Sequence, residues 1–140
     1  MTSNTPLVVG IGATAAGISA LEGFFGALRD AQGMAFVVVT PAGADQHGPL
    51  AELLGRATRL PVRLAEDGLR LRAETVYVLP EGAVAALRQG RLQLRRDLPN
   101  GRDRKPIDTF LSSLGRDQGE NAVAVVLSDR TVDGLLGAKV

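Results

Sequence analysis

The chain has no cysteine, a single histidine and no long apolar run. The lack of cysteine excludes disulfides, thiolate metal sites and a cysteine nucleophile, and one histidine with scattered carboxylates is no metal ligand set. No apolar run reaches the ~20 residues that a membrane-spanning helix needs. The N-terminal MTSNTP has neither a basic region nor a cleavage pattern. These absences predict a cytoplasmic protein without metal, cofactor or membrane insertion.

Neither sign of charge dominates the sequence. It has 16 basic and 15 acidic residues, for a net charge of +1. This balance provides no field that would gather nucleic acid or anionic lipid, so no nucleic-acid partner is expected. Apolar residues make up 45% of the 140 residues, which is enough for a packed core. The length predicts one domain over residues 1–140.

Continuous apolar segments alternate with segments of helical periodicity. The apolar segments are rich in β-branched residues, which predicts buried strands. They are Leu7–Ile11, Ala35–Thr40, Thr75–Pro80 and Ala122–Ser128, with a weaker candidate at Pro61–Asp67. Helices are predicted between them and at the end of the chain, over Ala16–Leu28, residues 49–58, Pro106–Asp117 and residues 133–140. Alternation of this kind predicts an α/β fold, with a doubly wound, mainly parallel sheet and helices on both faces.

One segment departs from this alternation. AALRQGRLQLRR alternates apolar and polar residues around Gln89–Gly90, which predicts an antiparallel hairpin with a tight turn. Phe24, Phe25 and Phe110 fall at helical core positions and are interpreted as packing residues. Asp108 falls in the first turn of a predicted helix, where its charge favours the helix dipole.

Loops that follow parallel strands meet at one edge of the sheet, which is where ligands bind in such folds. Three loops follow the strongest strands, at residues 12–17, 40–48 and 128–134. Gly10, Gly12 and Ala15, in and just before the first of these loops, have the spacing of the dinucleotide fingerprint. The next strand ends in Thr40 and Pro41, without the acid that binds ribose. A nucleotide-binding module at Gly10–Ala15 is therefore one alternative, and glycines that only permit a packed turn are another.

The same turn also suits a nucleophile. Thr14 stands at its apex, where a hydroxyl beside helix N-terminal amides favours acyl transfer if a histidine and an acid complete a triad. Asp133, in the loop after the last predicted strand, is placed to supply the acid. An N-cap for the following helix explains Asp133 equally well.

The order and spacing of the segments resemble the CheB family, the chemotaxis protein-glutamate methylesterases. The resemblance implies a Rossmann-like three-layer domain that hydrolyses glutamate methyl esters and deamidates glutamines on chemoreceptors with serine, histidine and aspartate. It also implies a partial domain, because the family's domain continues past the position of Val140. The segments that carry it are VVGIGATAAGISALEGFF, AFVVVT, LAELLGRATRLPV, AEDG, VYVLPEG, GRLQL, KPIDTFLSSL and VVLSDRTVDGLLG.

The resemblance breaks down at the catalytic positions. Thr14 stands at the serine of G-A-S-[TA]-G-G, and Pro41 stands at the histidine of V-x-Q-H. Asp133 keeps the acid of G-x-G-x-D-G, while Asp129 and Thr131 replace its glycines. Threonine can be a nucleophile when a base is adjacent, but proline has no titratable group. Loss of one triad member leaves only the ~10³–10⁴-fold catalysis that comes from oxyanion contacts and binding.

The sequence therefore predicts a degenerate methylesterase domain without esterase activity and with a binding or regulatory role in chemotaxis or signal transduction. Its expected partners are chemoreceptors or modules of signalling proteins, and an uncovered sheet edge favours a homo-oligomer. The alternative is an active methylesterase or deamidase in which His47, six residues beyond Pro41, is the base for Thr14. A solvent-exposed or helix-capping His47 is the simpler interpretation.

Overall fold

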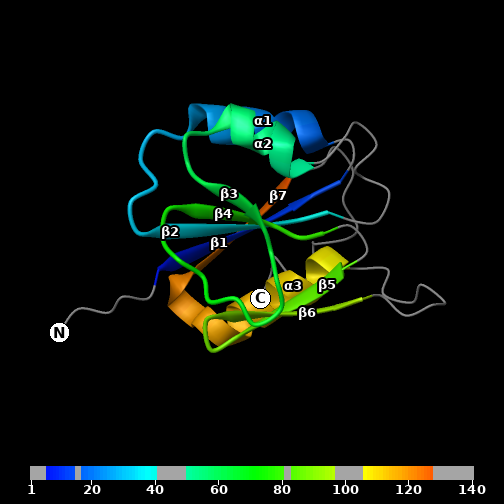
Figure 1. Ribbon diagram of the computed structural model, residues 1–140. Helices are drawn as coiled ribbons and strands as arrows, with labels where there is room; N and C mark the ends of the chain where they lie inside the picture. Colours follow the sequence, from blue (N-terminus) through cyan, green and yellow to red (C-terminus); the bar gives the residue numbers. More distant parts are fainter. Residues whose placement is uncertain (1–5, 15–16, 41–49, 81–82, 97–105, 128–140) are drawn as a thin grey trace.

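A five-stranded parallel sheet forms the centre of the molecule (Figure 1). The structure is a computed structural model and describes residues 6–14, 17–40, 50–80, 83–96 and 106–127. The strand order is β3-β4-β2-β1-β7, so that β1 lies between β2 and β7. The strands are β1 (Leu7–Ala13), β2 (Met34–Val39), β3 (Val62–Leu64), β4 (Thr75–Val78) and β7 (Ala122–Leu127).

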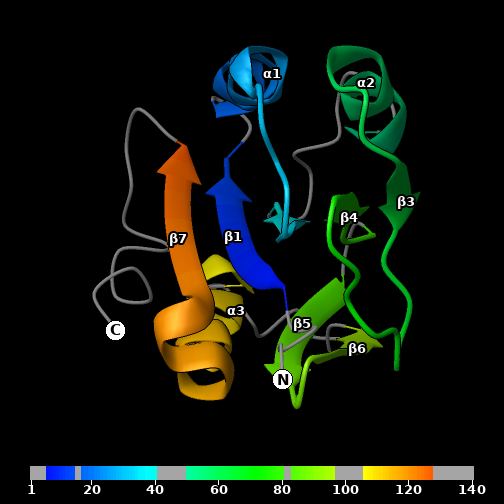
Figure 2. The same ribbon diagram turned by 90° about the vertical axis from the view of Figure 1, so that its left-hand side faces the viewer.

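Helices and a hairpin cover the two faces of this sheet. Figure 2 shows α1 (Ile18–Ala27) and α2 (Leu50–Ala57) on one face, with α3 (Pro106–Gln118) and the hairpin on the other. The hairpin consists of β5 (Ala83–Arg88) and β6 (Arg91–Arg96), and a short 3-10 helix, η2 (Gly119–Asn121), leads from α3 into β7. The predicted α/β fold with a mainly parallel sheet and an antiparallel hairpin is confirmed.

The sheet divides the interior into two apolar clusters. On the α1–α2 side, Phe25 and Phe36 are buried and contact each other edge to face, with ring centroids 5.5 Å apart. Phe24 adds a second edge-to-face contact with Phe25, at 5.1 Å. On the other side Phe110 of α3 is buried against the sheet. The interpretation of these phenylalanines as packing residues is confirmed.

Two glycines let α3 approach β1 closely. A Cβ at Gly10 would stand 2.7 Å from Leu114 Cδ2, and a Cβ at Gly12 would overlap the side chain of Ile107. On the opposite side of the same strand, Ile11 and Ala13 pack in the α1–α2 cluster. The predicted strand ended at Ile11, but β1 continues to Ala13. Gly12 therefore lies inside the strand and beneath α3, and the prediction that placed it in the turn is wrong.

The hairpin is tied to α3 through its turn. Gln89 and Gly90 both have positive φ, of 53° and 77°, as the tight turn predicted for these residues requires. Asp117 of α3 accepts hydrogen bonds from the amides of Gln89 and Gly90, the second at 3.0 Å. Ser113 Oγ, which is buried, accepts another from the Leu87 amide at 3.0 Å. The polar side of α3 thus holds β5 and its turn in place.

Other boundaries differ slightly from those predicted. α1 begins at Ile18 and ends at Ala27, and β3 is limited to three residues at an edge of the sheet. The helix predicted over residues 133–140 lies outside the described residues. Within the part that the structure describes, no helix is both long and apolar enough to cross a membrane.

The packing of α3 on β1 predicts an unequal response of two glycines to alanine. Gly12→Ala should lower the free energy of unfolding by about 1–3 kcal/mol, because the added methyl group overpacks the contact with Ile107. Gly23→Ala in α1, where nothing lies within 4 Å of the added Cβ, should raise it by about 0.5–1 kcal/mol. Denaturant unfolding followed by circular dichroism measures both. Equal effects of the two changes would contradict the close approach of α3.

The environment of the Asp117 carboxyl predicts that its contribution to the free energy of unfolding depends on pH. Burial raises the pKa of this carboxyl, but hydrogen bonds from Gly90, Gln118 and Gln89 outweigh burial and leave the pKa lowered. A lowered pKa stabilises the fold above the unfolded value of about 3.9, and this contribution is lost as the pH falls through the folded value.

The corresponding test compares wild type with Asp117→Asn. The variant should be less stable by about 1 kcal/mol at pH 7, since it keeps at most one of the two amide contacts. The difference should shrink toward zero below about pH 3. Glu120→Gln, at an exposed residue of η2, is the control and should leave stability unchanged at both pH values. A difference that persists undiminished in acid would exclude the carboxylate as its source.

Candidate functional site

The carboxyl ends of β1, β2 and β7 lie side by side at one edge of the sheet. Ala13 is in register with Leu127, and Gly12 is in register with Val39. In Figure 1 the ends of β1 and β2 point to the right, away from the N-terminus. The starting points of the three loops expected to form a site are therefore adjacent, as the parallel arrangement predicts.

The turn from β1 to α1 packs directly against the end of β7. The Gly17 amide donates to the Thr14 carbonyl at 2.8 Å, and the Thr14 amide donates to the Leu127 carbonyl at 3.4 Å. A Cβ at Gly17 would overlap that same Leu127 oxygen. Only glycine fits at this position, so the close contact between the turn and β7 depends on Gly17.

Thr14 stands where this turn meets the start of α1. Its side chain is half-buried. Gly17, the N-cap of α1, provides no side-chain cap, and the first turn of α1 contains no acidic residue. The positive end of the helix dipole therefore faces the turn, and no carboxylate in the first turn of α1 itself neutralises it, an arrangement that suits developing negative charge.

The first turn of α3 reaches the same edge. Ile107 contacts Gly12 near the end of β1, and Asp108 beside it is 8% exposed. The sequence assigned Asp108 only a favourable position near the helix dipole and gave no sign of its burial. The available signal was the apolar period of Ile107, Phe110, Leu111 and Leu114, which marks the stripe that faces the sheet and places Asp108 at its border.

The remaining predicted site residues are not part of the described structure. Thr40 is half-buried just after the end of β2, but Pro41, His47 and Asp133 lie outside the described residues. Their roles, and that of Thr14 as a nucleophile, stay predictions. No group of three histidine, aspartate or glutamate side chains suited to a metal ion occurs within the described ranges.

The glycines of the dinucleotide pattern have a packing role in this structure. Gly10 and Gly12 both lie inside β1 rather than in the turn, and their missing side chains make room for Leu114 and Ile107 of α3. A pyrophosphate-binding loop needs its glycines where the backbone leaves the strand and opens the helix. The contacts with α3 account for both glycines without a ligand.

The architecture and this edge define a class of protein: a three-layer α/β domain with a strand–turn–helix hydroxyl at the carboxyl end of its central strand. Comparison with known proteins identifies the family. The chain belongs to the CheB methylesterase family, whose model matches residues 9–140. The solved catalytic domain of the Thermotoga maritima CheB methylesterase superposes with a TM-score of 0.75 at 26% identity, covering 96% of this chain and 73% of that one.

Curated relatives agree with this assignment. A protein-glutamate methylesterase/protein-glutamine glutaminase of Gluconobacter oxydans is 34% identical over 143 residues, covering 93% of this chain and 39% of that protein. A 104.1 kDa protein from the hypE 3′ region of Rhodobacter capsulatus is 38% identical over 92 residues, which make up 9% of its length. The chain thus spans less than half the length of the curated relatives that it matches.

The packing role of Gly10 and Gly12 predicts that the domain does not bind dinucleotides or ATP tightly. Titration calorimetry with NAD and with ATP should show no binding at micromolar concentrations, because the second strand lacks a ribose-binding acid and the sequence has no Gly-Lys-Ser/Thr phosphate loop. Micromolar binding that disappears in Thr14→Trp, which fills the turn, would restore the nucleotide-binding alternative.

Proposed function

We propose that this chain is a degenerate CheB-type domain that keeps the fold but lacks methylesterase activity. In this proposal it has a binding or regulatory role in chemotaxis or a related signalling system. The observation that carries the proposal is Pro41. In the sequence it follows Thr40, just after the end of β2, and it has no group that can accept a proton.

The change at Thr14 points in the same direction. In this proposal Thr14 is the hydroxyl of a former nucleophile turn, which its place between β1 and the start of α1 supports. A threonine hydroxyl still requires an adjacent base to become a nucleophile. Its extra methyl group also restricts χ1 and crowds the attacking oxygen. Without a base, the Thr14 hydroxyl can preserve the structure of the site but cannot act as a nucleophile.

The relatives support the proposed setting. Several are named protein-glutamate methylesterase/protein-glutamine glutaminase, which makes methylated glutamates and glutamines of chemoreceptors the first binding partners to test. The Rhodobacter capsulatus relative, in which the matching segment is a small part of a long protein, supports a domain that acts within a larger assembly. The nearly complete coverage of this chain by one catalytic domain supports its interpretation as a single, partial domain.

Location and self-association complete the proposal. We place the domain in the cytoplasm, and we expect it to associate through β7. In the described sheet β7 has only β1 as a neighbour, and Val123 on it is 43% exposed. An apolar edge strand of this kind favours pairing with another strand.

Hydrolysis of a methylated receptor fragment tests the absence of activity. We expect wild type and Thr14→Ala to release methanol at the same background rate, because Thr14 has no base to activate it. Thr14→Ser combined with Pro41→His should also stay near background. Asp129 and Thr131 replace two glycines of the acid's loop, and restoring two side chains does not restore that loop.

Two results of the same assay would change the conclusion. Turnover by wild type that His47→Ala abolishes would establish the alternative enzyme, with His47 as base for Thr14. Turnover by the double variant alone would show an intact site that lacks only its triad, and would support the proposed loss of chemistry at Thr14 and Pro41. Circular dichroism of each variant checks that it remains folded.

A further inference from the structure

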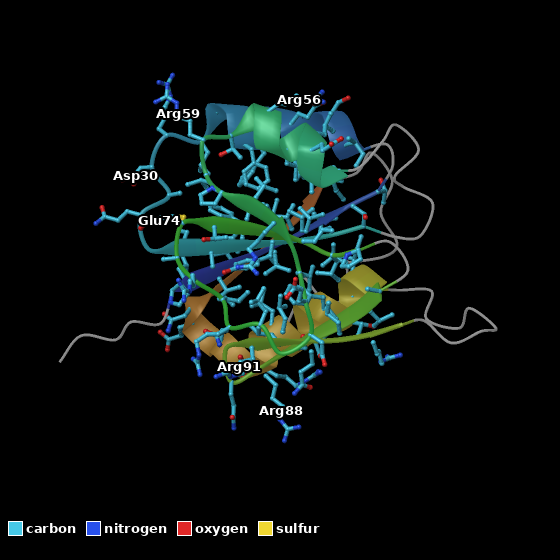
Figure 3. The ribbon with its side chains drawn as sticks, viewed as in Figure 1. Asp30, Arg56, Arg59, Glu74, Arg88 and Arg91 are labelled. Carbon is cyan, nitrogen blue, oxygen red and sulfur yellow. The ribbon has the colours of Figure 1, made fainter. Side chains whose placement is uncertain are left out.

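A groove of about 660 Å³ opens between the C-terminal ends of α1 and α2. Three arginines line it: Arg29 from the segment after α1, Arg56 from the last turn of α2 and Arg59 from the segment after α2. Figure 3 shows Arg56 and Arg59 on the layer formed by α1 and α2, away from Arg88 and Arg91 of the hairpin. Because α1 begins beside Thr14, the groove lies at the opposite end of this helix from the esterase-like edge.

Among the residues that the structure describes, no acidic residue lines this groove. Its remaining lining consists of apolar side chains and small residues, among them Phe25, Leu28 and Leu60. Within the described ranges, none of the three guanidinium groups forms an ion pair or a side-chain hydrogen bond. Asp30, next to Arg29 in sequence, instead accepts a hydrogen bond from the Gln32 amide at 3.0 Å. Among the described residues, the lining of the groove thus combines three arginines with apolar and small residues and contains no carboxylate.

Helix capping does not account for this cluster. The Leu28 amide already donates to the Phe25 carbonyl at the end of α1, and the Thr58 amide donates to the Leu54 carbonyl at the end of α2. Attraction to a helix dipole falls off within the last turn. It explains Arg56 but not Arg29 and Arg59, which lie two residues beyond the ends of their helices.

We propose that this groove binds a ligand that carries a phosphate group with at least two negative charges. Each planar guanidinium can donate two parallel hydrogen bonds to phosphate oxygens, and three of them line one groove. A single carboxylate would leave two of the positive charges unmatched. The proposal is independent of the esterase-like edge, since none of its residues belongs to that edge.

The test uses sodium pyrophosphate as the probe and measures its binding to the whole chain by titration calorimetry. The salt concentration is about 150 mM, at which weak attraction between the anion and scattered surface charges is screened. Arg56→Ala with Arg59→Ala should raise the dissociation constant at least about tenfold, because charge-assisted hydrogen bonds are lost. The matched control is Arg88→Ala with Arg116→Ala. It removes the same charge from exposed sites on the hairpin and α3, which cover the other face of the sheet (Figure 2). It should change the constant less than about twofold, because salt screens charges that are distant from the groove.

A conservative variant and a second probe sharpen the result. Arg56→Lys with Arg59→Lys keeps the charge and loses the planar donors, so it should bind more weakly than wild type and more tightly than the alanine pair. A phosphoserine peptide that binds more tightly than pyrophosphate, with the same dependence on Arg56 and Arg59, would assign the phosphate to a protein partner. The reverse order would assign it to a small molecule. No binding at millimolar pyrophosphate, or equal losses in the groove variant and the control, would overturn the proposal.

Discussion

The rest of this structure depends on one constraint: three positions along β1 and its turn must be glycine, because a side chain there would collide with a neighbouring helix or strand. β1 hydrogen-bonds to β2 on one side and to β7 on the other, and it is the strand that α3 crosses most closely. Gly10 and Gly12 open one face of the strand to α3, and Gly17 lets the following turn contact the Leu127 carbonyl. A larger residue at Gly17 would overlap the backbone of β7, and one at Gly10 or Gly12 would force side chains of α3 to move.

This constraint extends from β1 to the hairpin. Ile107 and Leu114 of α3 pack against β1. On the same helix, Ser113 and Asp117 accept hydrogen bonds from β5 and from the hairpin turn. The position of the hairpin therefore follows from how deeply α3 packs on the sheet. The same seating brings the first turn of α3, with the buried Asp108, to the edge where β1 and β7 end. The packing of α3 on the sheet therefore also determines which residues lie at the edge where the candidate site is expected.

The sequence predicted those parts of the fold that depend on local chemistry. β2, β4 and β7 are uninterrupted apolar segments, and the turn at Gln89–Gly90 has residues that accept positive φ. The strand order and the burial of Asp108 could not be read in this way. They depend on contacts between distant segments, such as Gly12 with Ile107, and no local pattern encodes a partner about a hundred residues away.

The glycine pattern shows why the candidate site was harder to predict than the fold. A backbone that must approach a pyrophosphate and a backbone that must approach a helix both exclude a Cβ, so both select glycine at the same spacing. The sequence therefore left both a ligand and a packed turn as alternatives for Gly10 and Gly12, with the missing ribose-binding acid against the ligand. The contacts with Leu114 and Ile107 decide for packing. The assignment of Pro41 to the base position rested on the family resemblance alone, whereas Thr14 was also singled out by its place between a strand and a helix.

The positions at which this chain keeps the family pattern differ physically from those at which it departs. Gly12 and Gly17 match G-A-S-[TA]-G-G, and each is in a place where a side chain would overlap Ile107 or the Leu127 carbonyl. Thr14 departs from the pattern at a half-buried position, where one more methyl group is accommodated. Packing thus accounts for the retained glycines whether or not a reaction occurs at this edge. The fold that this chain shares with the CheB methylesterase family depends on the packing of the layers, whereas catalysis depends on a few side chains that this packing does not require.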